Sequence, residues 1–360
     1  MGNVPHLRFP EFTEEWVNVS LKDVADFQKE RISSGLLDES TYISTENILQ
    51  NFQGVQSAIS IPANTNVVAY KKNDILLSNI RPYLKKVWFS DRIGGCSADV
   101  FVLRSKTCEP EFLYNVIASD KFINYVMSGA KGVKMPRGDK NQMESFSFSI
   151  PAVVEQRKIS RLFQLLDERI VTQNKIIYKL KSLIRGIAQN MVHRGKPNVR
   201  LSDCMICNSS TLQESEVLES GTYPVYGANG IVGYLDCYAT LNEAIYIIKD
   251  GSGVGTVFYV AGKCSAAGTL NTLQAKEGYS LQYLYYLLTV FNFEPYKTGM
   301  AIPHIYFKDY GKAKVFCPSH SEQFKYTKLL STIDSKLLAE QNALVNYNLQ
   351  KQYLLRQMFI

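Results

Sequence analysis

Apolar residues recur at every third or fourth position over two long stretches of the chain, Glu155 to Met191 and Glu322 to Met358. The steps average close to 3.5 residues, which is the period of a coiled coil. This pattern predicts two long helices that pair along an apolar seam, in preference to ordinary helices that each pack on the core of one domain. The seam positions are Ile159, Leu162, Leu166, Ile170, Gln173, Ile177, Leu180, Ile184, Ile187 and Met191 in the first helix, and Tyr326, Leu329, Ile333, Leu337, Glu340, Leu344, Tyr347, Lys351, Leu354 and Met358 in the second.

The two predicted helices are copies in an internal repeat with an offset of 167 residues. A proline followed by Glu-Gln opens both, at Glu155-Gln156 and at Glu322-Gln323. Gln173 and Glu340 lie at the midpoints of the two helices, so antiparallel pairing about a pseudo-two-fold axis brings them together. One polar pair in an apolar seam can specify the register of the pairing.

The segment in front of each helix contains short apolar runs separated by turn residues, which predicts strands and one helix in each copy. The fold class is therefore α+β, with two pseudo-repeated α/β domains at residues 1–152 and 195–318 and the helices at 153–194 and 319–360. The predicted elements of the first domain are strands at Thr41–Ile48, Asp74–Ile80, Lys86–Phe89 and Val100–Leu103 and a helix at Phe112–Met127; those of the second are strands at Ala244–Ile248 and Thr256–Val260 and a helix at Leu281–Phe291.

Composition narrows the class of protein. Hydrophobic residues make up 46% and charged residues 20%, which is typical of a globular chain. No stretch is apolar for long enough to span a membrane and no signal-peptide core is visible, so we expect a cytoplasmic protein without a membrane contact. The seven cysteines are scattered, and the C-x-x-C at Cys204 and Cys207 has no second pair at ligand spacing, so we expect neither a disulfide framework nor a metal site.

The net charge of +7 is compatible with a polyanionic partner. In the first domain, basic and hydrogen-bonding residues gather in two loops and are suited to phosphate and base-edge contacts with DNA. In the second domain, the loop from Lys249 is glycine-rich and nearly uncharged, and the other loop offers Lys297, His304, Tyr306 and Lys308. The alternative is that each is an ordinary solvated loop. The candidate DNA-binding residues are Asn79, Arg81, Tyr83, Lys85, Lys86, Lys131, Lys134, Arg137 and Lys140 in the first domain, and Lys249, Ser252, Lys297, His304, Tyr306 and Lys308 in the second.

The assembled pattern resembles the specificity subunit of type I restriction–modification systems over essentially the whole chain. The motifs that carry the resemblance are L-R-F-P-E-F-T-E-E-W from Leu7, D-I-L-L-S-N-I-R-P-Y-L-K-K from Asp74, I-P-A-V-V-E-Q-R-K-I from Ile150 and C-P-S-H-S-E-Q-F from Cys317. The resemblance implies two target-recognition domains, each reading one half of a split, asymmetric site on double-stranded DNA. It also implies that the paired helices fix the spacing of the two halves and dock two methylation subunits.

By the same resemblance, two restriction–translocase subunits join in the restricting form, and the partner subunits use S-adenosylmethionine, ATP and Mg. This chain is expected to hold no cofactor and no catalytic residue, since it has no adenine-methylation tetrad, Walker lysine or convincing nuclease cluster. Two alternatives stay open: a DNA-modifying nuclease or methyltransferase with an unrecognised site, and a binding scaffold for another nucleic acid, such as RNA.

Overall fold

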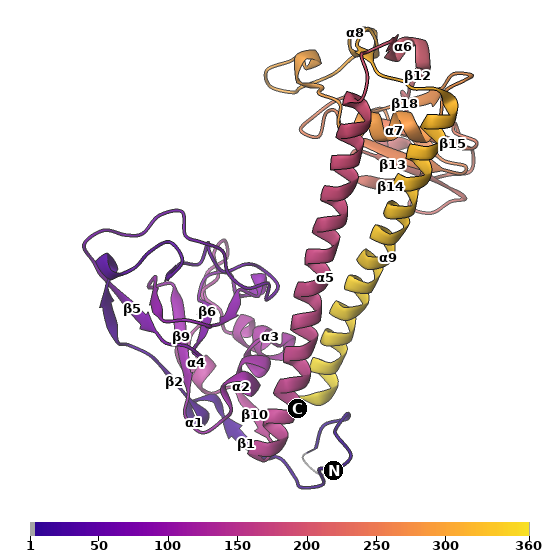
Figure 1. The fold of residues 1–360 in the computed structure, drawn as a ribbon. Coiled ribbons are helices and arrows are strands. Elements are labelled where there is room, and N and C mark those ends of the chain that lie inside the picture. The colour runs from indigo at the N-terminus through magenta and orange to yellow at the C-terminus, as the bar shows by residue number, and fades with distance from the viewer. Residues whose placement is uncertain (1–3, 360) are drawn as a thin grey trace. The chain divides into compact units, whose positions relative to one another are not determined.

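The computed structural model describes residues 4–359, and the chain divides into two compact units (Figure 1). Unit 1 comprises Met1–Thr172 and Leu344–Ile360, and unit 2 comprises Gln173–Ala343. Each unit therefore includes a segment of both long helices. Among the described residues, no helix is both long and apolar enough to cross a membrane.

Unit 1 is an α+β unit with two four-stranded sheets, ordered β2-β9-β6-β7 and β3-β5-β8-β4, and a short antiparallel pair β1-β10. Its elements are β1 (Val17–Ser20), α1 (Leu21–Val24), β2 (Ala25–Phe27), β3 (Arg31–Ser33), β4 (Tyr42–Ile43), β5 (Asn66–Tyr70), β6 (Ile75–Ser78), β7 (Val87–Phe89), β8 (Gly94–Cys96), β9 (Val100–Ser105), α2 (Pro110–Ile117), α3 (Asp120–Ser128), α4 (Lys140–Glu144) and β10 (Ser147–Ile150).

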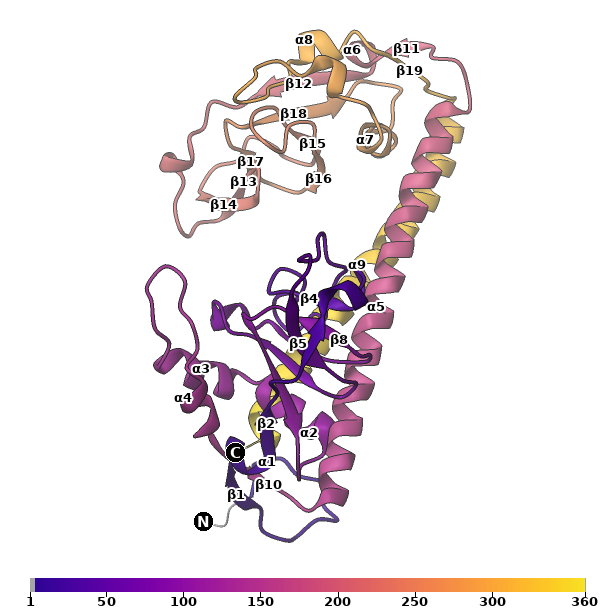
Figure 2. The same ribbon diagram turned by 90° about the vertical axis from the view of Figure 1, so that its left-hand side faces the viewer.

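Unit 2 repeats this plan with sheets ordered β12-β18-β15-β16 and β14-β13-β17 and the pair β11-β19. In this unit α7 lies beside the four-stranded sheet (Figure 2). Its elements are β11 (Val199–Arg200), α6 (Leu201–Cys204), β12 (Met205–Ser209), β13 (Tyr223–Gly227), β14 (Gly230–Leu235), β15 (Glu243–Ile248), β16 (Val257–Ala261), β17 (Ser265–Ala266), β18 (Leu270–Ala275), α7 (Leu281–Thr289), α8 (Phe307–Tyr310) and β19 (Lys314–Val315). The predicted α+β class and the internal repeat are both confirmed.

Two predicted elements are wrong in extent, whereas the bounds of the others agree with the structure to within about two residues at each end. The strand predicted at Thr41–Ile48 is reduced to β4, because the side chain of Asn47 accepts hydrogen bonds from the backbone and the hydroxyl of Ser44 and folds the rest into a turn. The single helix predicted at Phe112–Met127 is two helices, α2 and α3. The break falls at Ser119, whose hydroxyl oxygen accepts from the backbone N–H of Phe122 and caps α3.

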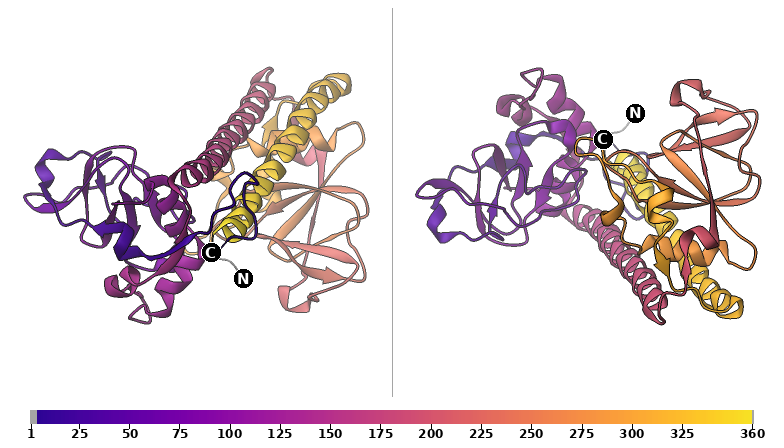
Figure 3. Two further views of the ribbon diagram at one scale, coloured as in Figure 1. Left: turned by 90° about the horizontal axis from the view of Figure 1, so that it is seen from below. Right: turned by 90° about the horizontal axis from the view of Figure 1, so that it is seen from above.

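The two long helices form as the seam predicts, as α5 (Val153–His193) and α9 (His320–Met358). They run side by side in opposite directions (Figures 1 and 3). In unit 1, Lys351 on α9 pairs with Asp167 on α5, Nζ to Oδ1 2.6 Å. In unit 2, the side-chain amide of Gln173 donates to the backbone oxygen of Glu340 at 2.9 Å and also to its carboxylate, which confirms the predicted antiparallel register.

Most of the predicted seam is buried or half-buried. Leu329 is the exception: it is 50% exposed, whereas its neighbour Leu330 is fully buried against the core of unit 2. The heptad pattern points to the partner helix, but at this end of α9 the buried face turns toward the α+β domain. A heptad pattern describes only the face of a helix that contacts its partner helix, so it cannot show where another face of the helix is buried against a domain.

Both long helices contribute side chains to the hydrophobic cores of both units. The core of unit 1 includes Ile159 and Phe163 from the beginning of α5 and Met358 from the end of α9. The core of unit 2 includes Met191 from the end of α5 and Leu330 from the beginning of α9. Each helix thus begins in the core of one unit and ends in the core of the other.

Candidate nucleic-acid interface

In unit 1, the two basic loops predicted from the sequence lie against each other. The backbone N–H of Arg81 donates to the oxygen of Pro136 at 2.8 Å, and the N–H of Gly138 donates to the oxygen of Asn79 at 3.1 Å. These bonds form a short antiparallel bridge between Ile80 and Arg137. Residues 79–86 and 131–140 are therefore one surface, which we call loop pair 1.

Unit 2 contains the same arrangement. The backbone N–H of Gly251 donates to the oxygen of Pro303, and the N–H of Ile305 donates to the oxygen of Lys249, both at 2.9 Å. Asp250 and His304 form the bridge. Residues 249–256 and 297–308 are loop pair 2, and together the two pairs contain every candidate DNA-binding residue.

In loop pair 1, two residues with basic side chains have a left-handed backbone conformation. Arg81 and Lys85 have φ of 51° and 54° and flank a single turn of 3-10 helix at Pro82–Leu84. In loop pair 2 the corresponding positions are Gly251 and Gly255, with φ of 95° and 90°. A side chain in this conformation costs on the order of 1 kcal/mol that glycine avoids, and such strain is typical of functional sites.

The basic residues of loop pair 1 differ in how they are engaged. Among residues 4–359, the side chains of Arg81 and Lys134 have no ion-pair or hydrogen-bond partner, and both are exposed. The others are held by acidic or carbonyl oxygens: Lys85 by Asp120 at 2.6 Å, Lys86 by the backbone oxygen of Thr45 at 2.6 Å, Lys131 by Asp139 at 3.1 Å, Arg137 by Asp99 at 2.6 Å and Lys140 by Glu144 at 3.4 Å. The bond from Lys85 holds the pKa of the Asp120 carboxyl below its ordinary value. Arg81 and Lys134 are thus the side chains most available to a polyanion.

Loop pair 2 has fewer available cations. The ammonium of Lys308 lies 5.2 Å from the centre of the Tyr306 ring, a cation–π distance. Nδ1 of His304 lies 3.4 Å from Oδ1 of Asp250. Lys249 is half-buried and Ser252 is exposed. Loop pair 2 is therefore richer in hydrogen-bonding groups than in charge.

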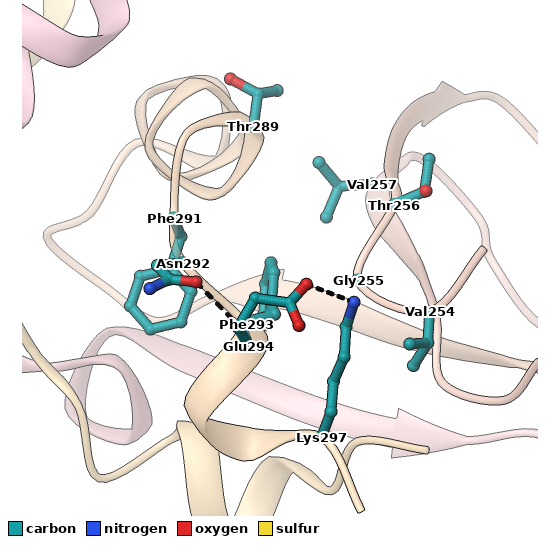
Figure 4. Close-up of a pocket in the computed structure, with 10 residues that line it drawn as sticks. All are labelled: Val254, Gly255, Thr256, Val257, Thr289, Phe291, Asn292, Phe293, Glu294 and Lys297. Atoms are coloured by element: carbon teal, nitrogen blue, oxygen red, sulfur yellow. Dashed lines mark hydrogen bonds and ion pairs between the residues drawn. The ribbon is translucent and has the colours of Figure 1, made fainter. Parts of the chain in front are cut away.

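A hollow of about 420 Å³ lies beside loop pair 2 (Figure 4). Within it, Nζ of Lys297 pairs with the carboxylate of Glu294 at 2.5 Å, and the side chain of Asn292 accepts from the backbone N–H of Glu294. The cation of Lys297 is therefore neutralised by its neighbour. Gly255 lines this hollow, whereas Lys85, at the corresponding position of unit 1, pairs with Asp120.

Metal chemistry has no visible basis in the part of the chain that the structure describes, since no group of three or more His, Cys, Asp and Glu side chains there could hold an ion. The Cys204 thiol of the C-x-x-C is buried and donates to the backbone oxygen of Arg200 at 3.2 Å.

Two acidic residues in or beside the loop pairs, Asp99 and Asp250, are not among the residues predicted from the sequence. The prediction treats acidic side chains only as unfavourable to DNA contact. Their one signal is their place next to the ends of buried strands.

The chain is thus a duplicated α+β unit with one polar loop pair in each copy and two long antiparallel helices. A family model described as the type I restriction modification DNA specificity domain matches the chain twice, over residues 13–182 and 196–347. The chain therefore belongs to this family.

Relatives of this chain include the type I restriction enzyme EcoDI specificity subunit of Escherichia coli, 23% identical over 49% of this chain and 41% of that protein. The MjaVIII specificity subunit of Methanocaldococcus jannaschii is 25% identical over 52% of this chain and 44% of that protein. The match spans less than half of the length of either relative.

Two solved structures share the fold along nearly the whole chain. The S subunit of a type I restriction–modification system from M. genitalium superposes with a TM-score of 0.68 and 17% sequence identity. The match covers 99% of this chain and 99% of that chain. A chain from a structural study of assembly and conformational transition in the type I system has a TM-score of 0.58, 17% identity and 98% coverage of both chains.

Proposed function

We propose that this chain is the specificity subunit of a type I restriction–modification complex, and that each unit reads one half of a split, asymmetric DNA target. One observation carries this proposal: two loop pairs have the same backbone hydrogen bonds but different side chains. A common frame suits a common ligand, the DNA duplex, while different side chains suit different base sequences. The paired helices would set the spacing between the half-sites.

Exposed apolar side chains on the two long helices support docking of two copies of one partner. Val171 and Tyr178 on α5 are exposed, and so are Leu338 and Val345, the residues 167 positions later on α9. Repeat-related patches suit two identical subunits, which we infer to be methylation subunits; two restriction subunits would join in the restricting form. The partners, and not this chain, would use S-adenosylmethionine, ATP and Mg in the cytoplasm, where the chromosome lies.

The test is to express the chain with its methylation subunit in a host without other adenine methylation and to sequence the modified positions. We expect one bipartite, asymmetric motif that requires both subunits. Methylation or cleavage of DNA by this chain alone would favour an enzyme instead. Equal competition by RNA and by duplex DNA would favour a different scaffold, although the family match favours neither alternative.

A further inference from the structure

Arg137 in unit 1 and His304 in unit 2 occupy the same position in the two loop pairs. Each follows a proline, Pro136 or Pro303. Each also exchanges two backbone hydrogen bonds within its own loop, Arg137 with Lys131 at 3.0 and 2.9 Å and His304 with Thr298 at 2.9 and 2.8 Å. The backbone frame is therefore the same, and only the side chain differs.

A carboxylate lies beside each of these side chains, but it comes from a different place in each unit. Nη1 of Arg137 lies 2.6 Å from Oδ1 of Asp99, whereas Nδ1 of His304 lies 3.4 Å from Oδ1 of Asp250. The backbone oxygen of Asp99 accepts from Asn79; in unit 2 the corresponding acceptor is that of Thr269, which has no carboxylate. The carboxylate thus comes from a different place in the chain in each unit, but it lies next to the side chain at the same loop position.

Both side chains keep donors or acceptors for a further contact. Arg137 is 52% exposed and His304 33%. A guanidinium has five N–H donors, so the bond to Asp99 leaves a fork that matches O6 and N7 of guanine. In His304, Nδ1 lies beside Asp250, so Nε2 is the one ring nitrogen left for a further contact. A Cβ added to Gly299 would lie 2.7 Å from Nε2, so glycine at position 299 makes room for this nitrogen. The histidine can therefore make one contact where the arginine can make two.

We propose that Arg137 and His304 each determine the base read at one position of their half-site, with Asp99 and Asp250 as positioning residues. This inference rests on the proposed function. Arg137 reads a guanine through two hydrogen bonds. His304 reads its base through one, so the position read by unit 2 is less strictly specified.

The experiment uses the full chain in complex with its methylation subunit and compares methylated motifs between variants. Arg137→Ala and Arg137→Lys should each relax a single base pair in one half-site and remove discrimination of about tenfold or more, the order that one bidentate contact supplies. His304→Arg should give guanine at a single position of the other half-site. Arg81→Ala is the matched control: the Arg81 side chain is exposed and without a partner among the described residues, and we expect it to contact a phosphate, so its loss should weaken all sites without changing the motif.

The variant Asp99→Asn tests whether Asp99 positions Arg137 or only stabilises the fold. It should relax the same base pair as Arg137→Ala and add nothing in the Arg137→Ala background. An unchanged motif in Arg137→Lys, or a uniform loss of methylation across all sites, would overturn the assignment. A wild-type complex that methylates no split motif would instead overturn the proposed function, and with it this inference.

Discussion

Asp167 and Asp334 are the same residue of the repeat in opposite surroundings, so one substitution should affect them differently. Asp167 on α5 pairs with Lys351 at 2.6 Å. Asp334 on α9 has no cation at the corresponding place, because the residue 167 positions before Lys351 is Ile184. The hydroxyl of Tyr286 donates to it instead. Burial raises the pKa of the Asp334 carboxyl above its ordinary value, and this hydrogen bond opposes the rise.

The sign of each effect follows from these contacts. Asp167→Asn removes the partner of Lys351, whose side chain is only 13% exposed, and should cost about 1 kcal/mol, since the other partner is 41% exposed and screened. Asp334→Asn keeps an acceptor for Tyr286 and removes a half-buried charge, so it should be neutral or stabilising at pH 7.5. Because the folded pKa of Asp334 is raised, its protonation favours the native state, and wild-type stability falls as pH rises through that pKa. The gain from Asp334→Asn should therefore vanish in acid.

The assay is urea unfolding of the full chain at pH 4 and pH 7.5. Trp16 and Trp88, the only two tryptophans, both belong to unit 1, so their fluorescence reports the unit that contains Asp167. Hydrogen exchange of α7 and of the part of α9 up to Ala343 reports on unit 2. If Asp334→Asn destabilises unit 2 at pH 7.5 as much as Asp167→Asn destabilises unit 1, the charge of Asp334 is stabilising and this reasoning is wrong.

Three further predictions test the seam, the loops and the repeat. Replacing Gln173 and Glu340 together with leucine should raise the urea midpoint, and a lower midpoint would show that the polar pair stabilises the seam. Arg81→Gly should raise the free energy of unfolding by about 1 kcal/mol and weaken DNA binding, and the dependence of log affinity on log salt concentration should become shallower by about 1. Lys134→Ala should give the same change in salt dependence at unchanged stability. If the salt dependence stays the same in both variants, neither side chain contacts DNA. The fragment Met1–His193 lacks Met358 and Leu354 of its core, but a second copy offers Met191 and Ile187 at the same repeat positions, so with the methylation subunit it should dimerise and methylate a palindromic motif. A fragment that stays monomeric with that subunit present would contradict this prediction.

Local periodicity was sufficient to predict the long helices and their pairing. A repeat of 3.5 residues specifies one contact face, and the midpoint residues Gln173 and Glu340 meet as antiparallel pairing requires. The same reasoning failed at Ser119, where a helix ends and another begins without a change in the apolar pattern. It also failed at Leu329, which is exposed because Leu330, and not Leu329, packs into the core of unit 2 at this end of α9.

The loop pairs were beyond prediction for a different reason. The sequence identified both loops of unit 1 by their basic residues, but their contact is a backbone pairing between Asn79 and Gly138, remote in the chain. Backbone hydrogen bonds leave no trace in side-chain composition. For the same reason, Asp99 could not be connected with Arg137, since the pairing that places them together is itself invisible in the sequence.

If each unit reads a half-site as proposed, this property of the loop pairs also explains how the two units can differ in specificity on one fold. Because the loops are joined through main-chain N–H and carbonyl groups, their frame does not depend on which side chains they carry. Arg81 and Lys85 in one unit and Gly251 and Gly255 in the other have positive φ at corresponding positions. Side chains at these positions can change at a cost on the order of 1 kcal/mol, which a folded domain tolerates. On the proposed function, a new base preference needs a new side chain at the position of Arg137 or His304 with a carboxylate beside it, and not a new loop.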